Sequence, residues 1–388
     1  MKISEKVQCF SEYAVKTRRY LHQIPELSGE EYKTSAFCKA QMREAGFMIT
    51  EYDGFTGFCA DLHIHDDMTL IAFRADMDAL EMEDRSENDF RSTHAGCAHN
   101  CGHDTHTAIL LTFGCYLSAH RETLTHNVRL IFQMAEEDMR IPGADKLVEL
   151  GCMVGVSEVY ALHNDGSQEK GKVLIREGIL SSYGSAWTVT IQGISSHGST
   201  PEKGLNVIAE GARLVQEINY IIANKVSPRS TAVLSIGMFH AGTIPNAIPD
   251  YAMLRGTIRT RDEATDLLVK SCFKTAIAKS ELEGFNAELD LVGYPAVINH
   301  PEAYRRVCDA AKKVVPSALI DAHCQPMAGS EDFSYMINAT EGRKGAMFFL
   351  GSGNAAEGVC NYLHSNPYYV DEEFMLIGVQ IFIHLVTA

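Results

Sequence analysis

Short, continuously apolar runs recur along the 388-residue chain, and helical segments separate them. Each run is followed at once by polar residues; the runs are 68–73 (MTLIAF), 128–132 (VRLIF), 158–162 (EVYAL) and 346–350 (AMFFL). This pattern is typical of strands that are buried on both faces because helices cover the sheet. The sequence therefore predicts an α/β fold around a central sheet.

Two helices are predicted before the first of these strands. The first covers about residues 4–22, with Ser4 as its candidate N-cap. The segment 24–29 (IPELSG) ends it. A second amphipathic helix follows and ends at Ala45–Gly46, where glycine suits a helix C-terminus.

The middle of the chain has a different order of elements. Strands are predicted at 187–192, 231–239, 251–260 and 287–292, and helices at 206–225 and 262–284. The order β-α-β-β-α-β is that of a ferredoxin-like unit. We therefore expect residues 182–294 to form a compact domain inserted into a larger one, which comprises residues 1–181 and 295–388.

Reactive side chains follow the predicted strands of the larger domain. Arg74, Asp76 and Asp78 come after the first run, Glu136 and Glu137 after the second, and His163 after the third. In open α/β sheets, ligands bind just beyond the carboxyl ends of the strands. We expect these groups to converge on one site, and we assign His364 to the same site.

The segment 97–106 (CAHNCGHDTH) concentrates groups that bind metals. Cys101 and His103 are one residue apart and could reach one metal ion or two adjacent ions, and zinc accepts both ligand types. The alternative is a closed structural zinc knuckle formed by Cys97, Cys101, His103 and His106. The Glu136–Glu137 pair favours a larger site, since adjacent buried carboxylates are costly unless one binds a cation or a proton.

Composition excludes several other classes of partner. The formal net charge of −16 argues against nucleic acid or an anionic membrane surface as the main partner. No apolar run reaches membrane-spanning length, and the N-terminus has no apolar block of a signal peptide. Eleven scattered cysteines without a disulfide spacing are typical of a reduced, cytoplasmic protein.

Six motifs then stand in the order found in the M20 peptidases. They are RADMDAL (74–80), CGHDTHTA (101–108), QMAEE (133–137), ALH (161–163), GSEDF (329–333) and LHS (363–365). Nearly the whole chain resembles this family. It looks most like the branch that contains aminoacylases, hippurate hydrolases, indole-acetyl-amino-acid hydrolases and aminobenzoyl-glutamate hydrolases. One such motif would be weak, but six in register are specific.

The resemblance implies a two-metal hydrolase. Its αβα catalytic domain would resemble that of zinc peptidases, and its inserted ferredoxin-like lid would also form a homodimer. By motif match, the metal ligands would be Cys101, His103, Glu137, His163 and His364. Glu136 would be the general base. Zn²⁺ is the favoured metal, and Mn²⁺, Co²⁺ and Ni²⁺ remain alternatives.

The resemblance also implies roles for residues around the metals. Asp78 and Asp104 would orient metal-bound histidine rings, and His106 would either do the same or serve packing. His197 would reach into the partner subunit's site and stabilise the oxyanion. Asn246 and Arg259 would bind the substrate carboxylate, and Gly329 would allow the substrate to approach the backbone.

The implied reaction is hydrolysis of an N-acyl or N-aroyl amino acid that has a free carboxylate. A dipeptidase of the same family is the second interpretation, and a non-catalytic zinc-binding protein is the third. The chain departs from the family where many relatives have proline, at Met134 and Glu81, and in the lid loop 193–201. These departures change the rim of the pocket, so they leave the identity of the substrate open.

Overall fold

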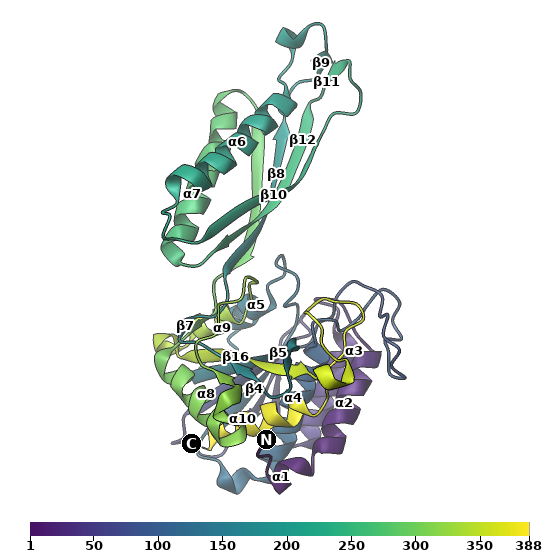
Figure 1. Cartoon of the computed structure of the whole chain (residues 1–388), viewed down its shortest axis with the longest axis vertical. Coiled ribbons are helices and arrows are strands. Elements are labelled where there is room, and N and C mark those ends of the chain that lie inside the picture. Colours follow the sequence, from purple (N-terminus) through teal and green to yellow (C-terminus); the bar gives the residue numbers. More distant parts are fainter. Residues whose placement is uncertain (388) are drawn as a thin grey trace. The chain divides into compact units, whose positions relative to one another are not determined.

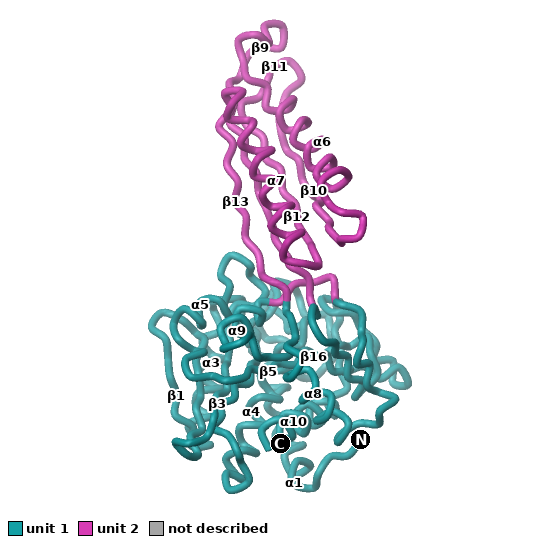
Figure 2. The backbone as a smooth tube through the Cα atoms, turned by 90° about the vertical axis from the view of Figure 1, so that its left-hand side faces the viewer, with its two compact units in different colours: residues 1–180, 297–326, 332–388 teal, residues 181–296, 327–331 magenta. Residues whose placement is uncertain are grey.

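The computed structural model describes residues 1–387, which form two compact units (Figures 1 and 2). Unit 1 comprises residues 1–180, 297–326 and 332 to the C-terminus, and unit 2 comprises residues 181–296 and 327–331. The segment 327–331, which the sequence assigned to the larger domain, joins unit 2. One contact that holds it there is a hydrogen bond from the Ser182 N–H to the Gly329 carbonyl at 2.9 Å.

Unit 1 is built on an eight-stranded mixed sheet with the strand order β1-β2-β4-β3-β5-β16-β6-β15. The four apolar runs of the sequence form its adjacent, parallel central strands. These are β3 (Leu70–Asp76), β4 (Asn127–Gln133), β5 (Val156–Glu169) and β16 (Gly345–Gly353). The remaining strands lie toward the edges: β1 (Met48–Glu51), β2 (Phe58–Leu62), β6 (Val173–Leu174) and β15 (Ile320–Asp321). The predicted α/β class is confirmed.

Helices cover both faces of this sheet, as the alternation of side chains in β3 shows. Phe73 points to one face, where its ring contacts Phe113 of α4 (His103–Ala119) at 4.8 Å and Phe382 of α10 (Phe374–Val386) at 4.9 Å. The next residue, Arg74, points to the other face and lies over the ring of Phe333, just before α9 (Ser334–Ala339). Neighbouring residues of a strand face opposite sides, so β3 contributes to two layers of core.

The N-terminal helix predicted at 4–22 is two helices, α1 (Glu5–Gln8) and α2 (Ser11–Gln23). Ser4 caps the first, since its side chain accepts a hydrogen bond from the Val7 N–H. The second predicted helix is α3 (Tyr32–Glu44), which ends before Gly46 as expected. Unit 1 also contains α5 (Gly143–Glu149), α8 (Pro301–Val314) and the short pair β7 (Gly178–Ile179) and β14 (Ile298–Asn299).

Unit 2 has the predicted β-α-β-β-α-β order. Its elements are β8 (Tyr183–Gln192), α6 (Val207–Lys225), β10 (Ala232–Ala241), β12 (Tyr251–Thr260), α7 (Glu263–Leu282) and β13 (Asn286–Tyr294). The four strands form an antiparallel sheet in the order β10-β12-β8-β13. Trp187 of β8 packs edge-on against Phe273 of α7 at 4.9 Å. Beyond β8, the short strands β9 (Ser196–His197) and β11 (Ala247–Ile248) pair with each other.

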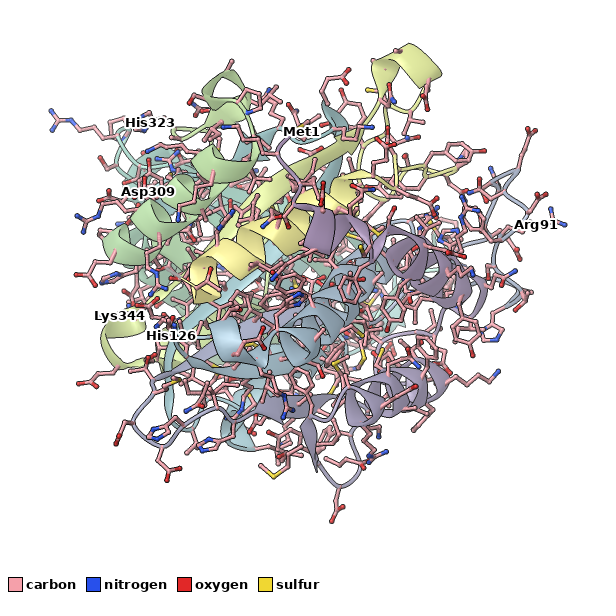
Figure 3. The ribbon with its side chains drawn as sticks, turned by 90° about the horizontal axis from the view of Figure 1, so that it is seen from below. Met1, Arg91, His126, Asp309, His323 and Lys344 are labelled. Carbon is pink, nitrogen blue, oxygen red and sulfur yellow. The ribbon has the colours of Figure 1, made fainter. Side chains whose placement is uncertain are left out.

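The amino and carboxyl ends of the parallel strands in unit 1 carry different kinds of residue. At the amino ends, His126 and Lys344 line a groove of about 1090 Å³ together with the start of β5. Figure 3 labels both residues. The carboxyl ends of β3 and β4 carry Asp76, Glu136 and Glu137, which the sequence predicts to be site residues.

None of the helices within residues 1–387 combines the length and the hydrophobicity needed to span a lipid bilayer.

Replacing Phe113 by Ala should lower the free energy of unfolding by about 3 to 5 kcal/mol, because its buried ring joins α4 to β3 and α10. Urea denaturation of the whole chain measures this change. The control is Tyr32→Ala, which removes an aromatic ring that is 69% exposed and should cost less than about 0.5 kcal/mol. Equal effects of the two substitutions would contradict the packing described here.

Candidate metal centre and active site

The first two expected ligands flank the start of α4. Gly102 lies between Cys101 and His103, and its φ of +89° is one that L-amino acids rarely adopt. A Cβ at Gly102 would lie 2.5 Å from both side-chain polar atoms of Asn164. Glycine at this position therefore lets the backbone turn so that a buried thiol and a buried imidazole face the same space.

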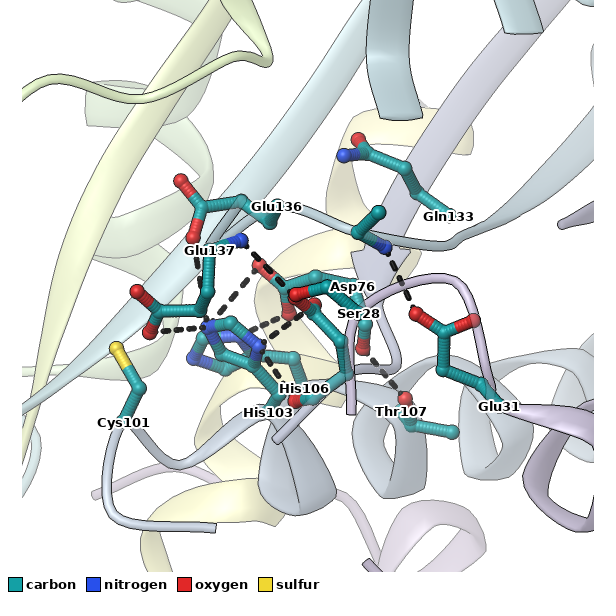
Figure 4. A network of polar contacts seen from close by, with 12 residues as sticks. Ser28, Glu31, Asp76, Cys101, His103, His106, Thr107, Gln133, Glu136 and Glu137 are labelled. Atoms are coloured by element: carbon teal, nitrogen blue, oxygen red, sulfur yellow. Dashed lines mark hydrogen bonds and ion pairs between the residues drawn. The ribbon is translucent and has the colours of Figure 1, made fainter. Parts of the chain in front are cut away.

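The expected ligands gather toward the carboxyl ends of the parallel strands. Figure 4 shows three of them, Cys101, His103 and Glu137. The Cys101 Sγ lies 3.5 Å from the His163 Nε2, and the His364 Nε2 lies 3.1 Å from the Glu137 Oε1. Ligand atoms lie within 4.8 Å of one another in each of three overlapping groups. These groups are Cys101/His103/His163, Cys101/Glu137/His364 and His103/Glu136/Glu137.

Hydrogen bonds to backbone carbonyls leave the Nε2 atoms of two buried histidines, His103 and His163, available to a cation. The Nδ1 of His103 lies 2.9 Å from the Asp78 carbonyl oxygen, and the Nδ1 of His163 lies 2.7 Å from the Asn164 carbonyl oxygen. A carbonyl only accepts, so both Nδ1 atoms carry a proton, and in the neutral form of each ring the Nε2 atom offers its lone pair. Among residues 1–387 the buried Nε2 of His103 finds no hydrogen-bond partner.

Negative charge is in excess around His103. Its Nε2 lies 3.6 Å from Asp76 and 3.9 Å from both Glu136 and Glu137. Burial lowers the pKa of His103, but the nearby carboxylates of Asp76, Asp78 and Glu137 outweigh it and raise that pKa to about 10. A cation at this position would relieve the same repulsion, so the local electrostatics fit a divalent metal.

The thiol and the remaining imidazoles complete a donor set that suits zinc. Burial, followed by the charges of Glu137 and Glu136, raises the pKa of Cys101 well above its usual value. A bound cation would favour the thiolate instead, because metals deprotonate a coordinating thiol. Burial lowers the pKa of His163 well below its usual value and keeps that ring neutral, as a ligand must be. Thiolate, imidazole and carboxylate are the ligands that Zn²⁺ takes in proteins.

Asp78 contacts two of the expected ligands at once. Its carbonyl and its Oδ1 both lie near the His103 Nδ1, at 2.9 and 3.2 Å. Its Oδ2 accepts hydrogen bonds from the Glu137 N–H at 2.9 Å and from the Ser28 hydroxyl at 2.7 Å. These contacts are those of a residue that orients both an imidazole and a carboxylate toward a common centre.

Asp104, for which the same role was predicted, has other partners. Its Oδ2 accepts hydrogen bonds from the Arg18 Nε and from the His22 Nδ1, each at 2.8 Å. Asp104 is the second residue of α4, and both partners belong to α2, so this buried group joins two helices instead of orienting a ligand ring. The position of Asp104 next to His103 does not predict these hydrogen bonds, because Arg18 and His22 lie more than 80 residues earlier in the chain.

Asp76 and His106 form a further buried pair that the sequence did not define. The Nδ1 of His106 donates to Asp76 at 2.6 Å, and the other oxygen of Asp76 accepts from Arg74 at 2.8 Å. The His106 Nε2 accepts from the Asn164 N–H at 2.9 Å. Both nitrogens of His106 are thus engaged, which favours a supporting role. Cys97 belongs to none of the candidate metal groups found within residues 1–387, so the local knuckle is not supported.

Two histidines of the cluster do not directly follow the end of a strand, as the sequence predicts for them. His163 lies inside β5, which continues to Glu169, and not after its end. His364 lies in the loop that follows β16, with a φ of +63° that is uncommon for a residue with a side chain. Its N–H donates to the Asn100 carbonyl at 2.9 Å, and this contact ties the loop to the segment that carries Cys101.

The remaining predicted residues belong to unit 2 and fall into two groups. His197 of β9 pairs with Ala247, which follows Asn246, and the Asn246 carbonyl accepts from the Gly198 N–H at 2.9 Å. Arg259 lies near the last residue of β12 and donates to the Ser185 carbonyl at 3.2 Å. Gly329 bonds to Ser182, so Arg259 and Gly329 both lie at the start of β8, and the His197 group lies beyond its end.

Gly102→Ala should impair metal binding, because the added Cβ would collide with Asn164 and the φ of +89° would become strained. Titration with Zn²⁺ against a competing chelator should show at least about tenfold weaker affinity. The matched control is Gly96→Ala, which shares a positive φ of +73° but has nothing within 4 Å of the new Cβ. This control should bind Zn²⁺ as wild type does. Unchanged affinity in Gly102→Ala would contradict the assigned centre.

Comparison with known proteins agrees with this geometry. The profile of peptidase family M20/M25/M40 matches residues 72–388. Thermostable carboxypeptidase 2 of Saccharolobus solfataricus is 32% identical over 381 residues, which cover 97% of this chain and 95% of that protein. N-acetyl-L-cysteine deacetylase of Bacillus subtilis is 32% identical over 370 residues, which cover 95% of this chain and 85% of that protein.

A solved structure shares the whole fold. The YXEP protein of Bacillus subtilis is described as a dinuclear metal-binding peptidase from the M20 family. It superposes with a TM-score of 0.80 at 27% sequence identity, over 98% of both chains. This similarity supports a centre of two metal ions, and the resemblance drawn from the six sequence motifs is confirmed. The chain therefore belongs to peptidase family M20/M25/M40, and it is a metal-dependent hydrolase of amide bonds.

Proposed function

We propose that the enzyme hydrolyses the amide bond of N-acyl or N-aroyl amino acids that have a free carboxylate. The observation that carries this proposal is the cluster of Cys101, three imidazoles and the Glu136–Glu137 pair around one space. The relative named N-acetyl-L-cysteine deacetylase supports an acylated amino acid as substrate. So does IAA-amino acid hydrolase ILR1-like 4 of Arabidopsis thaliana, which is 28% identical over 386 residues.

Amide hydrolysis needs a polarised carbonyl, a nucleophile at neutral pH and a proton for the leaving amine. Two divalent cations held by Cys101, His103, Glu137, His163 and His364 would supply the first two, as Lewis acids that also make water more acidic. Zn²⁺ is the proposed metal because the donor set combines sulfur, nitrogen and oxygen. Of the two glutamates, Glu137 is proposed to bind metal, and Glu136 is proposed to transfer the proton that the leaving amine needs.

Glu136 is the proposed general base. The residue is 8% exposed, and one carboxylate oxygen lies 3.9 Å from the His103 Nε2, so it borders the space that the ligands enclose. Glu137 faces His364 and is assigned to the metal, which leaves Glu136 to take the proton of the attacking water. Glu136 then delivers this proton to the amide nitrogen as the carbon–nitrogen bond breaks.

Arg259 is the proposed partner of the substrate carboxylate. It is half-buried, and burial lowers its pKa, with no acidic side chain to offset the effect. Its Nη1 donates only to the carbonyls of Ser185 and Ile258. A partly buried guanidinium without a carboxylate partner within residues 1–387 suits a carboxylate ligand, which it can bind with two parallel hydrogen bonds. Asn246 is a second proposed anchor, and Gly329 is proposed to line the substrate.

We further propose that the enzyme acts as a homodimer in which His197 serves the partner subunit's site. The His197–Asn246 group and the Arg259–Gly329 group lie at opposite ends of β8, a ten-residue strand that spans roughly 30 Å. One small substrate cannot touch both groups of the same chain. The edge strand β10 exposes Val233, Met238 and Phe239, which offers an apolar surface for association of two copies.

A dipeptidase or carboxypeptidase is the second candidate, and it is supported by the carboxypeptidase relative at equal identity. It would use the same centre and differ only in the group on the amino side of the scissile bond. A purely structural zinc site is disfavoured, because such sites are closed by four ligands and have no use for an additional base.

All eleven cysteines are free thiols, which fits the reducing cytoplasm that we propose as the location of the enzyme.

N-Acetyl, N-benzoyl and aminobenzoyl amino acids should be hydrolysed faster than unblocked dipeptides, and chelation of the metals should abolish turnover. Glu136→Gln should lower kcat by about 100-fold to 10,000-fold while two metal ions per chain remain bound. The matched control is the exposed Glu83→Gln, which should keep wild-type kcat. Faster hydrolysis of dipeptides would favour the peptidase, and an active Glu136→Gln enzyme would remove Glu136 from its role.

His197→Ala and Glu136→Gln should each be inactive alone, yet complement one another in a mixed dimer. Such a dimer, purified through two different affinity tags, contains one site with both native groups. It should show about half of the wild-type turnover per dimer, because one of two symmetric sites is complete. Turnover no higher than that of the single variants would show that His197 serves its own chain or no site at all.

A further inference from the structure

The turn that carries the two glutamates has an unusual backbone. Ala135 lies between β4 and Glu136, and its φ is +50°, in the left-handed region that favours glycine. Only three residues with side chains have a positive φ in residues 1–387, and Ala135 is one of them. A conformation of this kind persists only when surrounding contacts hold it. At Ala135 one such contact is a side-chain acceptor for its backbone N–H.

The contact comes from Glu31, more than 100 residues earlier in the sequence (Figure 4). Its Oε1 accepts hydrogen bonds from the Ala135 N–H at 2.9 Å and from the Gly29 N–H at 2.8 Å. Its Oε2 accepts one from the Thr56 hydroxyl. Glu31 precedes the first residue of α3 but makes no capping bond to that helix, and its side chain is fully buried.

A second carboxylate holds the other side of the same turn. The Oδ2 of Asp78 accepts from the Glu137 N–H at 2.9 Å, two residues after the N–H that Glu31 binds. The Ala135 carbonyl accepts from the Gly143 N–H at 3.3 Å. Glu136 therefore lies between two backbone groups, each fixed by a buried acceptor. The directions of the Glu136 and Glu137 side chains follow from these anchors.

We propose that Glu31 is a positioning residue, which holds the left-handed turn at Ala135 so that Glu136 and Glu137 face the metal centre. The inference rests on the proposed roles of these two glutamates. Glu31 belongs to none of the candidate metal groups found within residues 1–387, and it acts through the backbone N–H of Ala135. A residue needed only for packing would be apolar here, since a fully buried carboxylate is costly. Burial, with the charge of Asp78, raises the pKa of Glu31 to about 7, which reflects that cost.

Three substitutions separate positioning from a general structural role. Glu31→Ala removes the acceptor, and Glu31→Asp keeps the charge but is one methylene too short to reach Ala135. Glu31→Gln keeps an oxygen that can accept from the Ala135 N–H. The matched control is Glu30→Ala at the neighbouring exposed position. Zn²⁺ affinity by chelator competition, and kcat and KM on an N-acetyl amino acid, are measured for all four.

Glu31→Ala and Glu31→Asp should lower kcat by roughly 10-fold to 100-fold and weaken Zn²⁺ binding by a similar factor, with little change in KM. Glu31→Gln and Glu30→Ala should resemble wild type in all three measurements. If Glu31→Ala fails to fold, the contrast between Glu31→Asp and Glu31→Gln decides the question.

The inference is overturned if Glu31→Asp keeps wild-type Zn²⁺ affinity and kcat, or if Glu31→Gln is impaired as much as Glu31→Asp. A wild-type enzyme that hydrolyses none of the amides would refute the proposed function instead. In that case the Zn²⁺ affinities of the same variants still test Glu31, because they require no turnover.

Discussion

Repulsion among buried carboxylates is the constraint on which the arrangement of this centre depends. Asp76, Asp78, Glu136 and Glu137 surround the single imidazole of His103, and each is too buried for water to screen it fully. Part of the charge is offset by protein groups, such as Arg74 against Asp76 and the Glu137 N–H against Asp78. The remainder is left for cations, so the polypeptide and its metals share the neutralisation.

The sheet stabilises this concentration of charge, because the body of a strand packs in the apolar core while its end carries polar groups. In β3, Phe73 packs between helices on one face, and Arg74 and Asp76 begin the polar network at the strand's end. Parallel neighbours run in the same direction, so the ends of β3 and β4 and the middle of β5, at His163, bring their polar residues to one place. The apolar bodies of the strands are packed rigidly, which fixes the polar ends relative to one another.

Local patterns in the sequence were enough to predict the strands, the ferredoxin-like order of unit 2 and the residue types of the metal cluster. Those features depend on neighbours within a few residues, such as the apolar run before Glu136 or the spacing of Cys101 and His103. The partners of Asp104, the Asp76–His106 pair and the link from Glu31 to Ala135 depend on contacts between distant segments. Nothing in the composition of 26–31 distinguishes the buried Glu31 from the exposed Glu30 beside it. The segment 327–331 joins unit 2 and not the larger domain, because its contacts reach residues far away in the sequence, such as Ser182.

The length of β8 has a consequence for how the enzyme behaves in solution. A strand of this span keeps the His197 end and the Arg259 end of one polypeptide permanently apart. In the proposed dimer, a complete set of catalytic groups exists only while two copies are associated. Specific activity would then follow the association equilibrium and decline on dilution, even though every individual chain remains folded and loaded with metal.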